Sequence, residues 1–232
     1  MAAEVADEVK QSLGYQAFDR IKNDIVWCRL NPGEEVSEAR LCELYGLGKA
    51  PIRQALSRLV QEGYVLSVPR RGHFIAPVTL QSVKDLFELR LLLEPASVEG
   101  ACGRADAARL NQLNAECARG YRPGDEASEG AFMAANRAFH LEIARASGNA
   151  RLAKVLAQVI DEMTRLLHLG FVLRERPEEM THEHQDLVDA IIAGDKDRAR
   201  TIAIEHIRSV RALVVDGIVT HTNLSNITIV PN

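Results

Sequence analysis

The chain has 232 residues, of which 47% are hydrophobic and 26% are charged, and its formal net charge at pH 7 is −4. This length accommodates one or two domains, and the composition suits a packed core and shows no sign of disorder. No apolar run approaches the roughly 20 residues of a membrane-spanning helix, so we predict no membrane partner.

The cysteines and the first residues predict the compartment. The four cysteines are scattered and form no Cys-x-x-Cys pair, which is typical of free thiols. Residues 1–10 carry acidic side chains and lack the apolar segment of a secretory signal. Both features predict a protein of the reducing cytoplasm.

In chain order, the first elements are two helices and a turn. An opening helix is predicted over 12–28, with apolar residues on one side, and residues 30–33 form the turn that follows it. The Ser37 hydroxyl can accept an N–H of the first turn of a helix over 38–45. Gly46 ends that helix because glycine adopts positive φ without strain.

A second helix and a hairpin complete the N-terminal part. The helix is predicted over 51–62, because Pro51 suits a first turn and Gly63 provides a stop. Two helices joined by a few residues form a helix-turn-helix. Residues 65–68 and 74–75 are then predicted as two strands around a tight turn, which would be a wing.

A basic island covers the same stretch. From Arg40 to His73 the sequence has six basic residues and two acidic ones, whereas the whole chain has 28 basic and 32 acidic residues. Such an island favours phosphate binding, although a charge run is also compatible with a solvated helix face. We predict base-edge or nearby phosphate contacts for Lys49 and Arg53. Contacts that position the DNA backbone are predicted for Arg40, Arg58, Arg70 and Arg71. Gly72 and His73 of the wing complete the DNA-binding candidates, with capping of the ribbon as the alternative for His73.

Residues 15–77 resemble the winged-helix DNA-binding domain of GntR-family transcription regulators. The matching positions occur in one order along the chain, namely Pro32-Gly33, Ser37-Glu38, Gly46 to Leu56 and Glu62-Gly63. The sequence departs from the family where Gly48-Lys49-Ala50 replaces the usual Ser-Arg-Thr. Lysine still contacts a phosphate or a guanine, but without the fork of arginine. The resemblance therefore implies double-stranded operator DNA as partner, without indicating the usual half-site.

After Pro77 the pattern becomes helical throughout. Helices are predicted over 79–104, from 106 to at least 117, and over 129–147, 150–169, 178–193 and 196–217. The fold class is therefore mainly α, with an N-terminal winged helix-turn-helix carrying a two-stranded wing and a C-terminal all-α antiparallel bundle. We predict a DNA-binding domain over 1–77 and a metal-binding, effector-binding and dimerisation domain over 78–232.

Four polar residues of the bundle form a candidate metal site. Asn136 and His140 lie four residues apart, so they share one helix face, and His184 and His206 lie on later helices. Imidazole nitrogens and an amide oxygen from three helices can converge on a divalent ion inside a bundle. By spacing alone, a histidine among apolar neighbours can equally be a hydrogen-bonded core residue.

The C-terminal half resembles the FCD domain, the helical effector-binding domain of the FadR-like GntR branch. The matching residues are Glu88-Leu-Arg90, Leu93-Glu94, Asn136-x-x-Phe139-His140, Glu183-His184, and Gly194-Asp195 followed by His206. The resemblance implies that Asn136, His140, His184 and His206 bind a divalent metal, commonly zinc, nickel or manganese. It also implies that Arg90 contacts a small carboxylate effector, while an ion pair with Glu94 is the alternative for this arginine.

The combined prediction is a homodimeric transcription regulator. An organic acid bound at the metal and Arg90 would change its affinity for DNA. The resemblance favours a repressor, which the acid would release from DNA. Two alternatives stay open. The divalent ion itself could be the signal, or the histidines could belong to a metal-dependent hydrolase. No His-Glu-x-x-His segment supports the hydrolase, and a winged helix has no task in such an enzyme.

Overall fold

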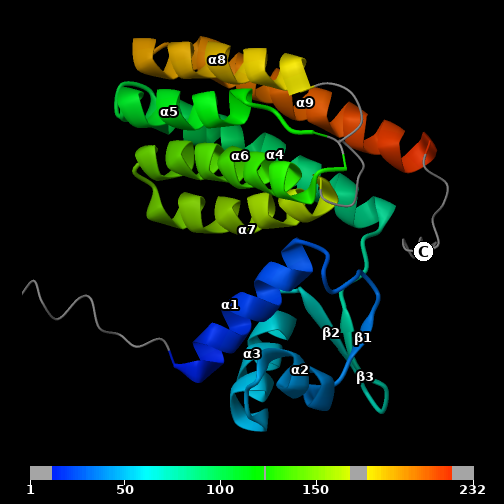
Figure 1. The fold of residues 1–232 in the computed structure, drawn as a ribbon. Helices are drawn as coiled ribbons and strands as arrows, with labels where there is room; N and C mark the ends of the chain where they lie inside the picture. The colour runs from blue at the N-terminus through cyan, green and yellow to red at the C-terminus, as the bar shows by residue number, and fades with distance from the viewer. Residues whose placement is uncertain (1–11, 123, 168–176, 221–232) are drawn as a thin grey trace, which may run out of the picture. The chain divides into compact units, whose positions relative to one another are not determined.

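A computed structural model describes residues 12–122, 124–167 and 177–220 (Figure 1). These residues form two compact units that divide after Thr79, here called the N-terminal unit and the C-terminal unit. Among the described helices, none is long and apolar enough to cross a membrane. The last two residues of the helix predicted over 150–169 lie outside the described residues.

The N-terminal unit contains the predicted helix-turn-helix. Its three helices are α1 (Leu13–Val26), α2 (Glu38–Tyr45) and α3 (Lys49–Gln61). The Ser37 hydroxyl accepts the Arg40 N–H at 3.1 Å, and Gly46 ends α2 with a φ of 66°. Both predicted ends of α2 are therefore confirmed.

A small antiparallel sheet follows the helices. Strands β2 (Val65–Val68) and β3 (Gly72–Ile75) form the predicted wing, paired from Val65 with Ile75 to Val68 with Gly72. A third strand, β1 (Glu35–Val36), pairs with the other edge of β3, so the order is β1-β3-β2. Strand β1 was not expected from the sequence, because two residues carry no alternating pattern of their own.

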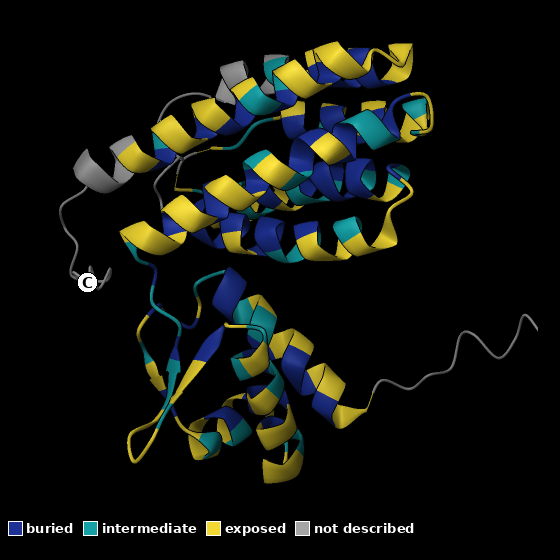
Figure 2. Cartoon of the chain, turned by 180° about the vertical axis from the view of Figure 1, so that it is seen from behind, coloured by how far each residue is buried: buried dark blue, intermediate teal, exposed yellow. Residues whose placement is uncertain are grey.

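Each helix of this unit has a buried face and an exposed face (Figure 2). The core contains Ile21 and Ile25 of α1, Leu41 of α2 and Leu56 and Leu59 of α3, all with at most 1% of their surface exposed. Because the helix-turn-helix and the sheet share this core, the wing and α3 are held in one small body.

The C-terminal unit is a bundle of helices, as predicted. The helices described in it are α4 (Leu80–Ala101), α5 (Ala107–Ala118), α6 (Glu126–Ala146), α7 (Ala150–Leu166), α8 (Pro177–Ala193) and α9 (Lys196–Thr220). Helix α4 packs against α6, α7, α8 and α9, and α5 packs against α6 and α8. Strong caps set several starts, since Asp106, Asp125 and Asn149 each accept a backbone N–H of the following turn.

The core of this bundle is not uniformly apolar. Phe139, Val188 and Ile191 are fully buried, as expected for facing helix stripes. Close to them lie buried polar side chains from α4, α6, α8 and α9: Arg90, Glu94, Asn136, His140, His184 and His206. Burying such groups is unfavourable unless they are paired or bind a ligand, so they mark the candidate site.

Candidate metal centre and DNA-binding surface

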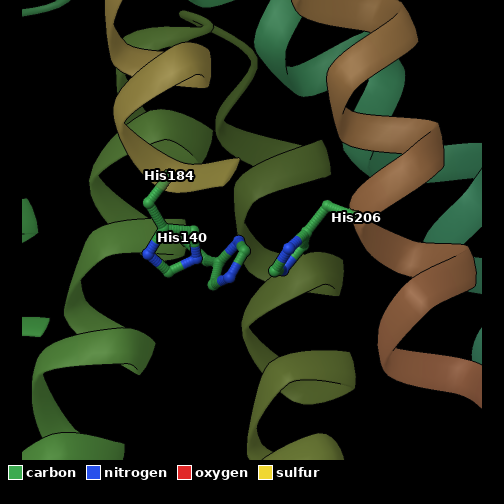
Figure 3. Close-up of side chains that lie close together, drawn as sticks. All are labelled: His140, His184 and His206. Carbon is green, nitrogen blue, oxygen red and sulfur yellow. The ribbon is translucent and has the colours of Figure 1, made fainter. Parts of the chain in front are cut away.

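Three of the predicted metal ligands converge inside the C-terminal unit. His140 on α6, His184 on α8 and His206 on α9 point toward one another (Figure 3), and each offers a ligand atom within 4.8 Å of the other two. Their side chains are at most 5% exposed. The ring of Phe139 stacks on His184 at a centroid distance of 4.4 Å and closes the cluster on one side.

Asn136 lies one turn before His140 on α6 and lines the same cavity as His140 and His206. The structure thus brings together all four residues predicted as ligands. Among the described atoms, Asn136 Oδ1 and both ring nitrogens of His184 are buried without a hydrogen-bond partner. An unpaired buried polar atom costs about 1–3 kcal/mol, and a coordinated divalent ion would remove that cost. The donor set therefore fits a metal ion of the zinc, nickel or manganese type.

The other two histidines each have a carboxylate beside Nδ1. Glu183 Oε2 lies 2.7 Å from His206 Nδ1, and Glu94 Oε2 lies 3.3 Å from His140 Nδ1. With Nδ1 protonated and donating to the carboxylate, Nε2 is the nitrogen left to bind a metal. Two of the three imidazoles are thus held in the orientation and tautomer that ligation requires.

Electrostatics keep these groups in suitable protonation states. Burial lowers the pKa of His140 and, more strongly, that of His184, which favours neutral rings. Burial also raises the pKa of Glu94, but the Arg90 charge and the His140 hydrogen bond outweigh it and hold that pKa well below its usual range. The hydrogen bond from His206 lowers the pKa of Glu183.

Arg90, the predicted effector contact, is paired inside the protein. Its side chain is 2% exposed, and its Nε donates to Glu94 Oε1 one turn along α4. Its guanidinium carbon also lies 5.6 Å from the centroid of the Phe87 ring. The structure therefore shows the ion pair that the sequence left as the alternative, and it places the pair against His140.

Two small cavities flank His140. One is lined by Arg90, Asn136 and His206 together with α7 side chains, and the other by Glu94, Ser97 and apolar residues. Each has a volume of about 10 Å³. That volume suits a single water molecule, whereas pockets for organic ligands measure roughly 300–1,000 Å³.

The residues predicted to bind DNA lie on the N-terminal unit. Lys49 is exposed in the first turn of α3. Arg53, one turn on, is 66% exposed and donates two hydrogen bonds to Glu38, at 2.8 Å and 2.9 Å. Arg40 is half exposed and contacts Glu34 at 2.6 Å. Three cations are thus presented around the helix-turn-helix.

The wing residues and Arg58 behave differently. Arg70 and Arg71 are exposed at the tip between β2 and β3, where Arg70 has a positive φ of 67°. Gly72 and His73 begin β3. Arg58 instead packs its guanidinium carbon 3.8 Å from the centroid of the Phe18 ring on α1 and pairs with Glu62. Arg58 is thus engaged on the side of α3 that faces α1.

Comparison with known families decides the identity. Residues 13–75 match the family described as bacterial regulatory proteins of the gntR family, and residues 85–209, more than half of the chain, match the FCD domain. The chain belongs to the GntR family. It is a transcriptional regulator with a helix-turn-helix domain and an FCD domain.

Relatives of this GntR-family chain carry the same kind of name. It is 28% identical over 191 residues to an uncharacterized HTH-type transcriptional regulator in an unstable DNA locus of Streptomyces ambofaciens, covering 82% of this chain and 80% of that protein. It is 29% identical to the HTH-type transcriptional repressor GlaR of Escherichia coli, and the match covers 81% of this chain and 89% of GlaR. The solved structure of E. coli McbR/YncC has the same fold, with a TM-score of 0.77 and 23% identity. The match covers 89% of this chain and 99% of that one. These relatives are regulators and not enzymes.

Sequence reasoning about the GntR-family chain missed the carboxylates beside the imidazoles. Glu94 was considered only as a partner of Arg90, and Glu183 only as the neighbour of His184. Glu183 contacts His206, which lies 23 residues further on in another helix. The sequence signal for these carboxylates was acidic residues on the same helices as the histidines or their neighbours. Many exposed helix faces carry such residues, so the signal was not specific.

Proposed function

We propose that this GntR-family regulator carries a divalent metal at Asn136, His140, His184 and His206, and that this site controls its affinity for operator DNA. The unpaired nitrogens of His184, enclosed with the oxygen of Asn136 in the core, carry this proposal. The metal, when bound, supplies a positive centre that can hold an anionic ligand. The protein acts as a homodimer, because a two-fold arrangement places two α3 helices in successive major grooves of a pseudo-palindromic site.

The first form of this proposal is a sensor of small organic acids. A carboxylate would bind at the metal and at Arg90, whose planar guanidinium suits a bidentate contact. To do so it must replace Glu94 as the partner of Arg90 and displace side chains that line the cavity, such as Met163 of α7 and Leu167 at its C-terminal end. Such a ligand changes DNA affinity to the extent that it binds one arrangement of the bundle better than the other.

The second form is direct sensing of the divalent ion. The cavity volume of about 10 Å³ favours it, because a water-sized space admits no organic acid without movement of the side chains that line it. In both forms the expected effect on transcription is repression, which the name of the relative GlaR supports. DNA contacts are assigned to Lys49 and Arg53 on α3 and to Arg40, Arg70, Arg71, Gly72 and His73 as positioning groups.

One experiment separates these forms. DNA duplexes are selected from a random pool by the full-length protein, and affinity is measured by fluorescence anisotropy. The protein is stripped with chelator, then supplied with Zn²⁺, Ni²⁺ or Mn²⁺, with and without a panel of hydroxy and dicarboxylic acids. A change on adding metal alone supports direct sensing, and a change that needs metal and acid supports acid sensing. Equal affinity in every condition, for wild type and for His184→Ala, would refute control through this site.

A further inference from the structure

The ligand set of the metal site brings no negative charge of its own. Asn136 is a neutral amide, and imidazoles such as those of His140, His184 and His206 bind a metal as neutral rings. Glu94 contributes a carboxylate, but Arg90, which is equally buried, balances its charge. A divalent ion in this cluster would therefore need an anion from elsewhere, because an uncompensated charge in the protein interior is strongly disfavoured.

Glu183 is placed to supply that charge. Its described contacts are with His206 and Ser209, neither of which is a lysine or an arginine. Its side chain is 30% exposed, whereas that of His206 is 3% exposed, so Glu183 lies between the cluster and solvent. Its Oε2 lies 2.7 Å from His206 Nδ1, so the carboxylate directly adjoins the ligand set.

We infer that Glu183 is the positioning residue of the metal centre: it holds His206 with Nε2 toward the ion and provides the net negative charge that the direct ligands lack. This inference rests on the proposed metal site and deepens it. Glu94 orients His140 in the same manner, but its charge is used by Arg90. Of the two carboxylates described beside the imidazoles, Glu183 is therefore the one that can provide both orientation and charge.

The position of Glu183 also links two helices. It directly precedes His184, so α8 provides both a ligand and the partner of the ligand on α9. An ion bound by His184 and His206 would join α8 to α9, and the contact of Glu183 with His206 joins the same two helices beside the ion. A metal signal that reaches the rest of the bundle through α8 and α9 would therefore depend on Glu183.

The test compares two neighbouring carboxylates in the full-length protein. Glu183→Gln keeps a hydrogen-bond acceptor but removes the charge. Glu205→Gln is the matched control, because Glu205 is exposed and directly precedes His206 on α9. Zn²⁺ affinity is measured by competition with a fluorescent chelator. We expect Glu183→Gln to weaken Zn²⁺ binding by about 10–100-fold, as for other partners of metal-bound histidines, and Glu205→Gln to leave it within about twofold. Glu183→Asp, which keeps the charge, should recover part of the loss.

A second readout addresses orientation. Long-range ¹H–¹⁵N spectra of the metal-free protein report which nitrogen of His206 carries the proton, and we expect Nδ1 in wild type and a mixture of tautomers in Glu183→Ala. Equal Zn²⁺ affinities for the Glu183→Gln and Glu205→Gln variants would overturn the inference while leaving the metal site intact. Absence of Zn²⁺ binding by the wild type itself would instead overturn the proposed function, and the inference with it.

Discussion

The two units of this regulator use charged side chains in opposite ways. In the N-terminal unit the Arg53 side chain is 66% exposed, and its partner Glu38 lies on the neighbouring helix of the same surface. In the C-terminal unit the Arg90 side chain is 2% exposed, and its partner Glu94 contacts a histidine of the core. The arginine of an exposed pair can exchange its carboxylate partner for a DNA phosphate at little cost in free energy, because exposed ion pairs are weak. The arginine of a buried pair cannot leave its partner without leaving a charge unpaired in the core. Charge alone therefore does not identify a DNA-binding arginine. Burial decides whether an arginine can bind an external phosphate or pairs with a carboxylate of the protein interior.

The largest effect is expected from breaking the buried pair. Helix α4 offers a matched comparison, because Lys84 and Glu88 form an exposed pair at the same four-residue spacing. Glu94→Ala leaves Arg90 charged and unpaired in the core and should lower the free energy of unfolding by about 3–5 kcal/mol. Glu88→Ala should lower it by about 0.5 kcal/mol or less. Urea titrations of the metal-free proteins measure both values, and similar losses would show that the buried pair has no special role.

An intermediate effect is expected from the arginines of α3. Arg53→Ala should weaken binding to the selected DNA by about 1–3 kcal/mol, because an exposed guanidinium at the helix surface is lost. Arg58→Ala should leave DNA binding nearly unchanged and instead destabilise the unit, since Arg58 stacks on Phe18 and pairs with Glu62. Anisotropy titrations together with melting curves distinguish the two variants. A larger loss of DNA affinity for Arg58→Ala than for Arg53→Ala would contradict the assignment.

The smallest effect on stability is expected from the helix N-caps, which the two units share as a local feature. Ser37 caps α2 in one unit and Asp106 caps α5 in the other, each by accepting a backbone N–H at 3.1 Å. Ser37→Ala and Asp106→Ala should each cost about 1 kcal/mol of stability. Thermal melts of both variants, with Ser57→Ala on the exposed face of α3 as a control, measure this. Costs that differ strongly would mean that tertiary contacts, and not the caps, fix these helix starts.

Local signals allowed much of the fold to be predicted. Helix α2 was predicted over 38–45 and has these bounds, because a serine cap and a left-handed glycine determine them. Helix α3 begins at Lys49 and not at Pro51, since its N-cap is Gly48, which has no side chain to reveal the start. Helix α6 begins at Glu126, three residues before the predicted 129, because Asp125 in the apparent loop is a cap.

The members of the histidine cluster were predictable, but their surroundings were not. His140, His184 and His206 were singled out by the resemblance to the FCD domain, because spacing alone left hydrogen-bonded core histidines as an alternative. The pairing of Glu183 with His206 depends on how α8 and α9 pack, which helical spacing does not specify. The same holds for the cavity between α7 and Arg90: it is lined by Ile160 and Met163 of α7 together with Arg90, an arrangement that has no sequence signal.

The most direct test of the central claim is the metal content of the stripped and refilled protein. Full-length protein is treated with chelator, dialysed against Zn²⁺, Ni²⁺ or Mn²⁺, washed and measured by plasma mass spectrometry. His184→Ala removes one member of the cluster, and His73→Ala, a histidine of the wing, is the control. The account predicts about one ion per chain in wild type and His73→Ala and almost none in His184→Ala. Equal metal content in all three proteins, or none in wild type, would contradict it.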